Sequence, residues 1–313
     1  MAMLSIPGVE KEVSRLALGT LTLTVEEAGY TQWRLLLGRF FELGGRVIDT
    51  AYIYNRGQSE RGLGRWLAEH GLRDKLVIVD KGTHQAADGR WLIDPEHIAA
   101  DLSVSLERLG VSTIDLYLLH RDNVQLPVGT LVECLNRHID NGSIQAYGVS
   151  NWTMARIEEA LEYAERHSLR PISANSPNVT LARTITPLWE GCVTLDAVSQ
   201  QWHREHGLLV LAWSSQARGF FSGRFTRGQV EDRLVRASYD CDDNWERLRR
   251  VQQLAAEKGT TPARIALAWV LGEPYPILPL IGPLTVAELE DSWLALSVQL
   301  TPAERHWLNL EGE

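Results

Sequence analysis

The sequence has little of three features that would each define a class of protein. It contains only three cysteines among 313 residues, at Cys134, Cys192 and Cys241. Their odd number and wide spacing argue against a disulfide framework or a zinc site and fit a reducing compartment. The longest apolar runs, such as Leu208 to Trp213, are far shorter than the ~20 residues that a membrane-spanning helix needs.

Positive charge is the third scarce feature. The 31 lysines and arginines are outnumbered by 40 aspartates and glutamates, which gives a formal net charge of −9. Nucleic acids and anionic membranes attract basic surfaces, so we expect neither as a partner. Met1 to Ser14 has no basic start and no long apolar core, so we expect no signal peptide. The protein is therefore expected in the cytoplasm, while its oligomeric state stays open.

Apolar residues are plentiful but occur in short segments. They make up 44% of the chain, against 23% charged residues, as in a globular protein with a large core. Several segments lack polar alternation, which is typical of strands that are buried on both faces. The predicted strands are Leu16–Thr20, Val47–Thr50, Leu76–Asp80, Ile114–Leu119, Gln145–Val149, Pro171–Ala174, Leu208–Trp213 and Ile277–Ile281.

Amphipathic segments of helical length lie between these strands. Asp94-Pro95 and Thr261-Pro262 are helix start signals, and Gly110 and Gly142 stand where helices commonly end. The predicted helices are Tyr30–Leu43, Pro95–Leu109, Val128–Asn141, Thr153–Arg166, Leu195–His206, Pro262–Leu271 and Val286–Leu296.

Eight strands that alternate with helices predict a single (β/α)8 barrel domain over residues 1–313. A doubly wound sheet is the alternative. No GxGxxG motif follows the first strand, however, and the glycine-rich stretch from Gly57 to Gly64 has a different spacing. The longest irregular region, Gly219–Asn244, follows the seventh strand. We expect it to be a long loop that acts as a lid or a cofactor clamp.

Four residues with proton-transfer chemistry stand at or just past predicted strand ends: Asp49, Tyr54, Lys81 and His120. The carboxyl ends of barrel strands meet on one face, so these side chains should converge. Lys81 would lower the pKa of Tyr54 by stabilising its phenolate, and Asp49 would keep Lys81 charged. His120 would hydrogen-bond a substrate carbonyl oxygen while Tyr54 protonates the oxyanion that forms as hydride arrives.

Each of these residues also has a purely structural explanation when it is taken alone. An aspartate at a strand end caps helices or binds loops, a tyrosine packs, and a lysine at a strand end is usually solvated. It is the combination on three successive strands that favours a catalytic group.

The segments that carry the four residues resemble the aldo-keto reductase superfamily, and the resemblance covers nearly the whole chain. Asp49 to Gly64 (DTAYIYNRGQSERGLG) is similar to the family segment with its aspartate and tyrosine. Val79 to Lys81 and Leu116 to His120 are similar to the strands with its lysine and histidine. The resemblance implies hydride transfer between NADP(H) and a carbonyl carbon, with the catalytic roles given above.

The resemblance also implies which residues hold the dinucleotide. Gly148 to Asn151, Leu211 to Arg224 and Pro279 to Ser292 are similar to the family's carboxamide, pyrophosphate and adenosine-phosphate segments. Trp213 would stack on the nicotinamide ring where the family usually has tyrosine. The implied cofactor-binding residues are Thr20, Ser150, Asn151, Ser176, Trp213, Ser214, Gln216, Gly219, Arg224, Gly282, Glu288 and Ser292.

The cofactor segments depart from the family pattern in two places. Ser176 stands where the family usually has a carboxamide-binding glutamine. The stretch 282–291, where a basic residue often binds the 2′-phosphate, contains no lysine or arginine but has Glu288, Glu290 and Asp291. Acids repel a 2′-phosphate and can bind a free 2′-hydroxyl. We therefore expect NADP(H) from the resemblance, with NAD(H) more competitive than usual.

Two alternatives to this cofactor interpretation stay open. The acids could simply form a solvated helix face. Alternatively, Arg227, Arg233 or Arg236 in the long loop could restore phosphate binding.

The substrate is expected to be a small carbonyl compound or alcohol. The candidates for the pocket walls are Trp91 and Trp152, and the polar candidates, which favour a sugar or another hydroxylated carbonyl, are Asn55, Arg56, Arg121 and Asp122.

Two other functions compete with this enzyme. The chain is also similar to superfamily members that serve as non-catalytic NADP(H)-binding regulatory subunits of membrane channels. A lyase that forms a Schiff base through Lys81 is the less favoured third interpretation.

Overall fold

The barrel is closed. A computed structural model describes residues 4–84 and 91–311. Within it, eight strands close a barrel in the order β10-β3-β4-β5-β6-β7-β8-β9. The predicted (β/α)8 barrel is confirmed, and the alternative of an open doubly wound sheet is wrong. The bounds are β3 (Ala17–Gly19), β4 (Val47–Asp49), β5 (Val77–Gly82), β6 (Ile114–Leu119), β7 (Ile144–Ser150), β8 (Ala174–Ser176), β9 (Leu209–Ala212) and β10 (Ile277–Ile281).

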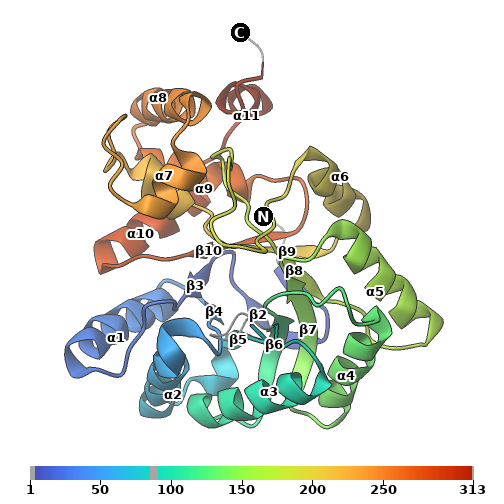
Figure 1. The fold of residues 1–313 in the computed structure, drawn as a ribbon. Helices are drawn as coiled ribbons and strands as arrows, with labels where there is room; N and C mark the ends of the chain where they lie inside the picture. The colour runs from blue at the N-terminus through green and yellow to red at the C-terminus, as the bar shows by residue number, and fades with distance from the viewer. Residues whose placement is uncertain (1–3, 85–90, 312–313) are drawn as a thin grey trace. The chain divides into compact units, whose positions relative to one another are not determined.

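The chain divides into two compact units, Met1–Ser176 and Pro177–Glu313; that the barrel is one domain stays a prediction. In the first unit, helices α2 to α5 lie along the outside of β4–β7 (Figure 1). The helices of this unit are α1 (Glu27–Glu42), α2 (Gln58–His70), α3 (Pro95–Leu109), α4 (Val128–Asp140) and α5 (Met154–Arg166).

Local capping explains where the predicted helices begin and end. The Asp94 carboxylate accepts from the backbone N–H of His97 at the start of α3, and Pro95 occupies its first turn. Gly110 ends α3 with φ +66°, a conformation that glycine adopts without strain. These are the signals that the sequence displayed, and α3 has the predicted bounds.

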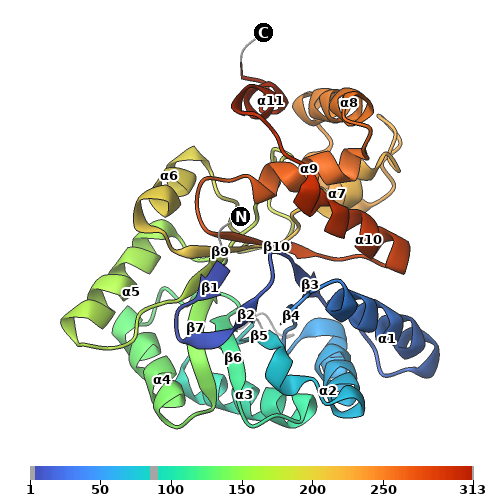
Figure 2. The ribbon, with the colours of Figure 1, turned by 180° about the vertical axis from the view of Figure 1, so that it is seen from behind.

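The first unit also contains a hairpin that was not predicted. Strands β1 (Leu4–Ile6) and β2 (Val9–Val13) pair antiparallel, and Figure 2 shows them in front of β6 and β7. The Lys11 ammonium lies 2.8 Å from the Asp115 carboxylate of β6 and donates to the Leu76 carbonyl before β5. The hairpin therefore contacts the amino ends of the strands, whereas the candidate catalytic residues stand at the carboxyl ends.

Helix α2 was not predicted either, and its glycines have a packing role. A Cβ added at Gly64 would lie 2.6 Å from the Arg108 carbonyl oxygen of α3. A Cβ at Gly62 would lie 2.9 Å from the Leu23 side chain. These glycines allow close packing of α2 and are not sites of chain flexibility.

The second unit replaces the predicted long loop with helices. Residues 219–244 include the end of the turn η3 (Ala217–Ser222), all of α7 and the start of α8. The prediction that this segment is irregular throughout is therefore wrong. The Asp232 carboxylate accepts from the backbone N–H groups of Leu234 and Val235 and starts α7. The helices of this unit are α6 (Ala197–His206), α7 (Arg233–Tyr239), α8 (Asp242–Glu257), α9 (Pro262–Leu271), α10 (Val286–Leu294) and α11 (Pro302–Leu308).

The described part of the chain, 4–84 and 91–311, shows neither a membrane-spanning helix nor a metal cluster. Within it, no helix has the length and apolar character needed to cross a membrane. Its acidic, histidine and cysteine side chains form no group of three or more that could hold a metal ion.

Candidate active site

Four candidate catalytic side chains meet at the carboxyl ends of β4, β5 and β6. The Lys81 ammonium donates to the Asp49 carboxylate at 2.5 Å and to the Thr50 carbonyl at 2.9 Å. The same ammonium lies 3.4 Å from the Tyr54 hydroxyl oxygen. The rings of Tyr54 and His120 meet edge to face, with 5.8 Å between their centroids.

The Lys81–Asp49 pair is buried, since each residue is only 2% exposed. Burial alone would lower the pKa of Lys81, but the Asp49 carboxylate and Tyr54 outweigh it, so the pKa of Lys81 is raised. A buried ammonium is costly unless an anion accompanies it. Asp49 therefore keeps a permanent positive charge beside the Tyr54 hydroxyl.

Tyr54 differs from the prediction in the direction of its pKa shift. Burial raises the pKa of Tyr54, and the nearby Lys81 and Arg121 charges only partly oppose that rise. Lys81 lowers the pKa of Tyr54 as expected, but burial raises it by more, so the net shift is upward. The phenol keeps its proton at neutral pH. Lys81 offsets part of the cost that burial adds to losing this proton.

His120 is a neutral imidazole in this site. Burial lowers its pKa well below the usual value, and Lys81, Arg121 and His84 lower it further. A neutral imidazole has one N–H donor and one acceptor nitrogen. His120 can thus donate one hydrogen bond to a carbonyl oxygen without competing with Tyr54 as the acid.

The turn that begins at Tyr54 after β4 has a strained backbone at the next two residues. Tyr54 begins a short helical turn in which Asn55 and Arg56 have φ of +45° and +56°. The Asn55 amide donates to the Leu23 carbonyl at 3.1 Å and fixes this turn. Non-glycine residues in this region cost about 1–3 kcal/mol and are concentrated at functional sites. Asn55 therefore supports the turn, and the exposed Arg56 stays a candidate substrate contact.

Other residues predicted to line a substrate pocket have structural partners. Asp122 forms an ion pair with Arg156 at 3.2 Å. Trp152 is only 2% exposed and donates from its indole to the Arg121 carbonyl. The Arg121 guanidinium donates to the His120 carbonyl at 2.8 Å, so it supports the strand end that carries His120.

His84 belongs to the site although the sequence analysis did not name it. Its ring lies 5.1 Å from that of His120 and 6.4 Å from that of Trp91. We call Tyr54, His120, His84 and Trp91 the aromatic row. The position of His84 three residues after Lys81, just past the same strand, was the signal in the sequence.

The candidate carboxamide holders of the first unit form one cluster. The Asn151 amide donates to the Ser150 hydroxyl at 2.9 Å, and that hydroxyl donates to the Ser176 carbonyl at 2.8 Å. Ser150 pairs with Ser176 in the β7–β8 register. Thr20 lies at another strand end, where its hydroxyl donates to the Asp49 carbonyl at 2.9 Å. The structure brings Ser150, Asn151 and Ser176 together and places Thr20 beside the catalytic aspartate.

The candidate nicotinamide and pyrophosphate residues lie in the second unit. Trp213 follows β9, and its ring is 5.9 Å from that of the half-exposed Trp189. The next residue, Ser214, has φ +50°. Gly219 has φ +80°, and a Cβ there would lie 3.0 Å from the Arg224 guanidinium. The turn after β9 therefore sets glycine backbone directly against an arginine.

The candidate adenosine-phosphate segment joins this turn within the same unit. The Gln216 amide donates to the Ser292 hydroxyl at 3.2 Å. A Cβ added at Gly282 would meet no atom within 4 Å, so the backbone there is open. Three of the predicted cofactor residues, Gln216, Gly282 and Ser292, are thus on elements that meet in this unit.

Two of the three acids near this segment have structural roles. The Glu288 carboxylate accepts from the Leu284 backbone N–H at 2.7 Å. Asp291 forms an ion pair with Arg264 at 2.8 Å. Among the loop arginines, Arg227 pairs with Asp242, and Arg236 donates to the Val230 carbonyl. Arg233 is exposed at the first residue of α7.

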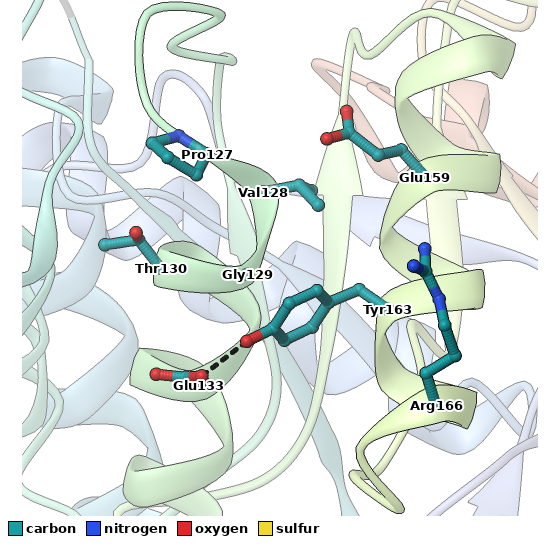
Figure 3. Close-up of a pocket in the computed structure, with 8 residues that line it drawn as sticks. All are labelled: Pro127, Val128, Gly129, Thr130, Glu133, Glu159, Tyr163 and Arg166. Atoms are coloured by element: carbon teal, nitrogen blue, oxygen red, sulfur yellow. Dashed lines mark hydrogen bonds between the residues drawn. The ribbon is translucent and has the colours of Figure 1, made fainter.

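A separate surface hollow lies between α4 and α5 (Figure 3). Tyr163 crosses it and donates to Glu133 at 2.5 Å. A Cβ at Gly129 would lie 2.3 Å from the Tyr163 ring, so the two helices pack closely at this point. None of the four catalytic candidates lines this hollow, which is lined by Pro127, Val128, Gly129, Thr130, Glu133, Glu159, Tyr163 and Arg166.

The site and the fold together define a parallel barrel with a buried lysine–aspartate pair beside a tyrosine. The family model described as "Aldo/keto reductase family" matches residues 15–307. The chain belongs to the aldo/keto reductase family, whose members are oxidoreductases, and the resemblance inferred from the sequence is confirmed.

Two curated relatives and two solved structures illustrate the family match. The oxidoreductase YrpG of Bacillus subtilis is 28% identical over 95% of this chain and 91% of its own length. The aldo-keto reductase yakc [NADP(+)] of Schizosaccharomyces pombe is 26% identical over 84% of this chain and 77% of its own. Both structures are 23% identical and cover 99% of this chain and 95% of theirs. They are a Klebsiella pneumoniae aldo-keto reductase in complex with NADPH (TM-score 0.73) and the glycerol dehydrogenase AKR11B4 of Gluconobacter oxydans (TM-score 0.79).

Asp80 is a buried acid immediately before Lys81, and its residue is 0% exposed. Burial raises its pKa well above the usual value, and the nearby Glu60 raises it further, while Lys81 and Ser105 oppose the rise. The Asp80 carboxyl group is therefore protonated in the folded protein at pH values where the unfolded chain has ionised it.

This difference makes the effect of Asp80→Asn depend on pH. Because the pKa of Asp80 is higher in the folded than in the unfolded protein, the wild type loses folding stability as pH rises above the unfolded value of about 3.9. Asparagine has no such proton. The unfolding free energy of Asp80→Asn minus that of the wild type should therefore rise by up to about 1.4 kcal/mol per pH unit. Urea unfolding from pH 5 to 8 measures this difference, and the exposed Asp140→Asn is the control. A difference that stays flat with pH would contradict a protonated Asp80.

Proposed function

We propose that the protein reduces the carbonyl group of a small aldehyde, ketone or keto-sugar to an alcohol, or catalyses the reverse, with NAD(P)(H). The observation that carries this proposal is the Lys81 ammonium held between the Asp49 carboxylate and the Tyr54 hydroxyl. A protonated phenol, a fixed cation and a neutral imidazole are the groups that carbonyl reduction requires.

In this mechanism each of the four side chains has a separate role. His120 donates its N–H to the carbonyl oxygen and orients it. Tyr54 transfers its proton to that oxygen as negative charge develops there. Lys81, 3.4 Å from the phenol oxygen, stabilises the phenolate that remains, and Asp49 keeps Lys81 charged. The reverse reaction uses the same phenolate as a base.

The proposed cofactor is a nicotinamide dinucleotide, which supplies or accepts the hydride when bound. The cluster of Ser150, Asn151 and Ser176 offers hydroxyl and amide groups suited to a carboxamide. In the second unit, Gly219 and Arg224 suit a pyrophosphate because a backbone without a Cβ lies directly beside a guanidinium cation there. Trp213 offers an aromatic face for stacking.

A Schiff-base lyase is disfavoured by the state of Lys81. Nucleophilic lysines need a lowered pKa so that the free amine is available. Lys81 instead has a raised pKa and an aspartate partner at 2.5 Å. The assembled proton-transfer group likewise supports an enzyme over a non-catalytic regulatory subunit.

The direct test of the acid is Tyr54→Phe, which removes one hydroxyl group. General acid catalysis contributes about 10²–10⁴ in rate, so kcat for carbonyl reduction should fall by that factor. Binding of the dinucleotide, followed by quenching of tryptophan fluorescence, should stay within about threefold because the phenol hydroxyl serves the chemical step.

Tyr52→Phe is the matched control. Tyr52 lies two residues earlier, and its ring packs under the Arg108 guanidinium at 4.5 Å. Its variant should keep its activity. Turnover by Tyr54→Phe at the level of this control would refute the mechanism.

For the choice of dinucleotide, we propose NADP(H) with NAD(H) unusually competitive. The yakc protein, which is named for NADP(+), and the Klebsiella protein, whose structure contains NADPH, support NADP(H). The stretch 282–291 contains no lysine or arginine, and Glu288 holds a negative charge at the start of α10. Because this stretch has no cation of its own and Arg264 is paired with Asp291, a 2′-phosphate gains little over a hydroxyl.

The ratio of kcat/KM for NADPH to that for NADH should therefore stay below about 100, which corresponds to less than about 3 kcal/mol. Glu288→Gln should raise the ratio because it removes the repelling charge, whereas the exposed Glu257→Gln should not. A wild-type ratio above about 100, unmoved by Glu288→Gln, would contradict the proposal.

A further inference from the structure

The aromatic row contains one buried ring, that of His120, and one exposed ring, that of Trp91. Its ring centroids are 5.8 Å apart for Tyr54 and His120, 5.1 Å for His120 and His84, and 6.4 Å for His84 and Trp91. His120 is 8% exposed, whereas Trp91 is 39% exposed. His84, which is intermediate in exposure, stands between these two rings.

The backbone that holds His84 is strained. Thr83, a β-branched residue, has φ +62°, which is a genuine outlier for that residue type. Its N–H donates to the Asp101 carboxylate of α3 at 2.8 Å, and its hydroxyl donates to the Gly82 carbonyl at 2.6 Å. Strain of this kind costs about 1–3 kcal/mol and persists where the surrounding structure imposes it, often at functional sites. Here the strained turn directs the next residue, His84, against His120.

The two imidazoles meet edge to face, with 75° between their planes. In the proposed mechanism, the N–H of His120 binds the carbonyl oxygen. An imidazole in contact with His120 can then reach a polar atom one carbon away on the same substrate. Because an imidazole nitrogen can donate to or accept from a hydroxyl, the matching group is a hydroxyl on the carbon next to the carbonyl.

We infer that His84 is a specificity-determining residue that binds the 2-hydroxyl group of the substrate. The preferred substrates are then 2-hydroxy aldehydes and ketones, the group that reducing sugars and small keto-alcohols share. This inference rests on the proposed function, since it places the reacting carbonyl on His120.

The test compares two aldehydes that differ by one hydroxyl, 2-hydroxypropanal and propanal. One hydrogen bond contributes about 0.5–1.5 kcal/mol net, or up to about tenfold. The wild type should therefore prefer 2-hydroxypropanal by up to about tenfold in kcat/KM. His84→Phe keeps the ring but not its nitrogens, so the preference should fall to within about twofold, mainly through a higher KM for 2-hydroxypropanal. The readout is the ratio of the two kcat/KM values, which does not depend on a loss common to both aldehydes.

Three further variants separate recognition from structural damage. His84→Gln restores a donor and an acceptor and should recover part of the preference. His84→Leu should also lose the preference for 2-hydroxypropanal, and it serves as the test if His84→Phe does not fold. His167→Phe is the control, because this histidine also stacks on an aromatic ring, that of Tyr163 at 4.2 Å, but lies outside the aromatic row.

The outcomes distinguish this inference from the function on which it rests. If the wild type reduces propanal but shows no preference, or if His84→Phe and His84→Leu keep the preference, His84 does not bind the hydroxyl. An equal loss for both aldehydes with no recovery in His84→Gln also overturns the inference. If the wild type binds NADPH yet reduces neither aldehyde, the proposed function fails, and the inference fails with it.

Discussion

The contact on which the candidate site depends is the buried ion pair between Lys81 and Asp49. Its two members come from neighbouring strands, β5 and β4, and both are almost completely shielded from water. Removing either partner would leave an uncompensated buried charge, which typically costs several kcal/mol. The pair gives Tyr54 a fixed cation as a neighbour, and the same cation helps to keep His120 neutral. This ion pair therefore influences the protonation states of both Tyr54 and His120 in the candidate site.

Much of this arrangement could be predicted because parallel strands impose it. Asp49, Lys81 and His120 stand at the ends of consecutive strands, and barrel closure brings such ends together. Helix α3 could be placed because its caps, Asp94 and Gly110, are local signals. The direction of the Tyr54 pKa shift was not predictable, because burial opposes Lys81 and burial depends on the folded chain.

What the sequence could not display depends on contacts between distant segments. Helix α2 was not predicted, and its glycines serve close packing against α3 and Leu23, which the sequence alone does not show. Of the acids after β10, Asp291 is tied to Arg264, an ion pair that only the structure reveals. The sequence shows only that His84 stands just past the strand that carries Lys81, and its contact with His120 is seen only in the structure. The candidate cofactor and substrate contacts therefore could not be predicted without the structure. The grouping of Asp49, Lys81 and His120 could be predicted from the order of the strands.

The central claim is that Asp49 and Lys81 act through Tyr54, and a double-mutant cycle in kcat/KM tests it most directly. Asp49→Asn, Tyr54→Phe and the double variant would be compared on one aldehyde. Residues that act as a unit have non-additive effects. We predict that the double variant is no slower than Tyr54→Phe alone, within about threefold. Losses that multiply, with each variant slowing the reaction independently, would contradict the account.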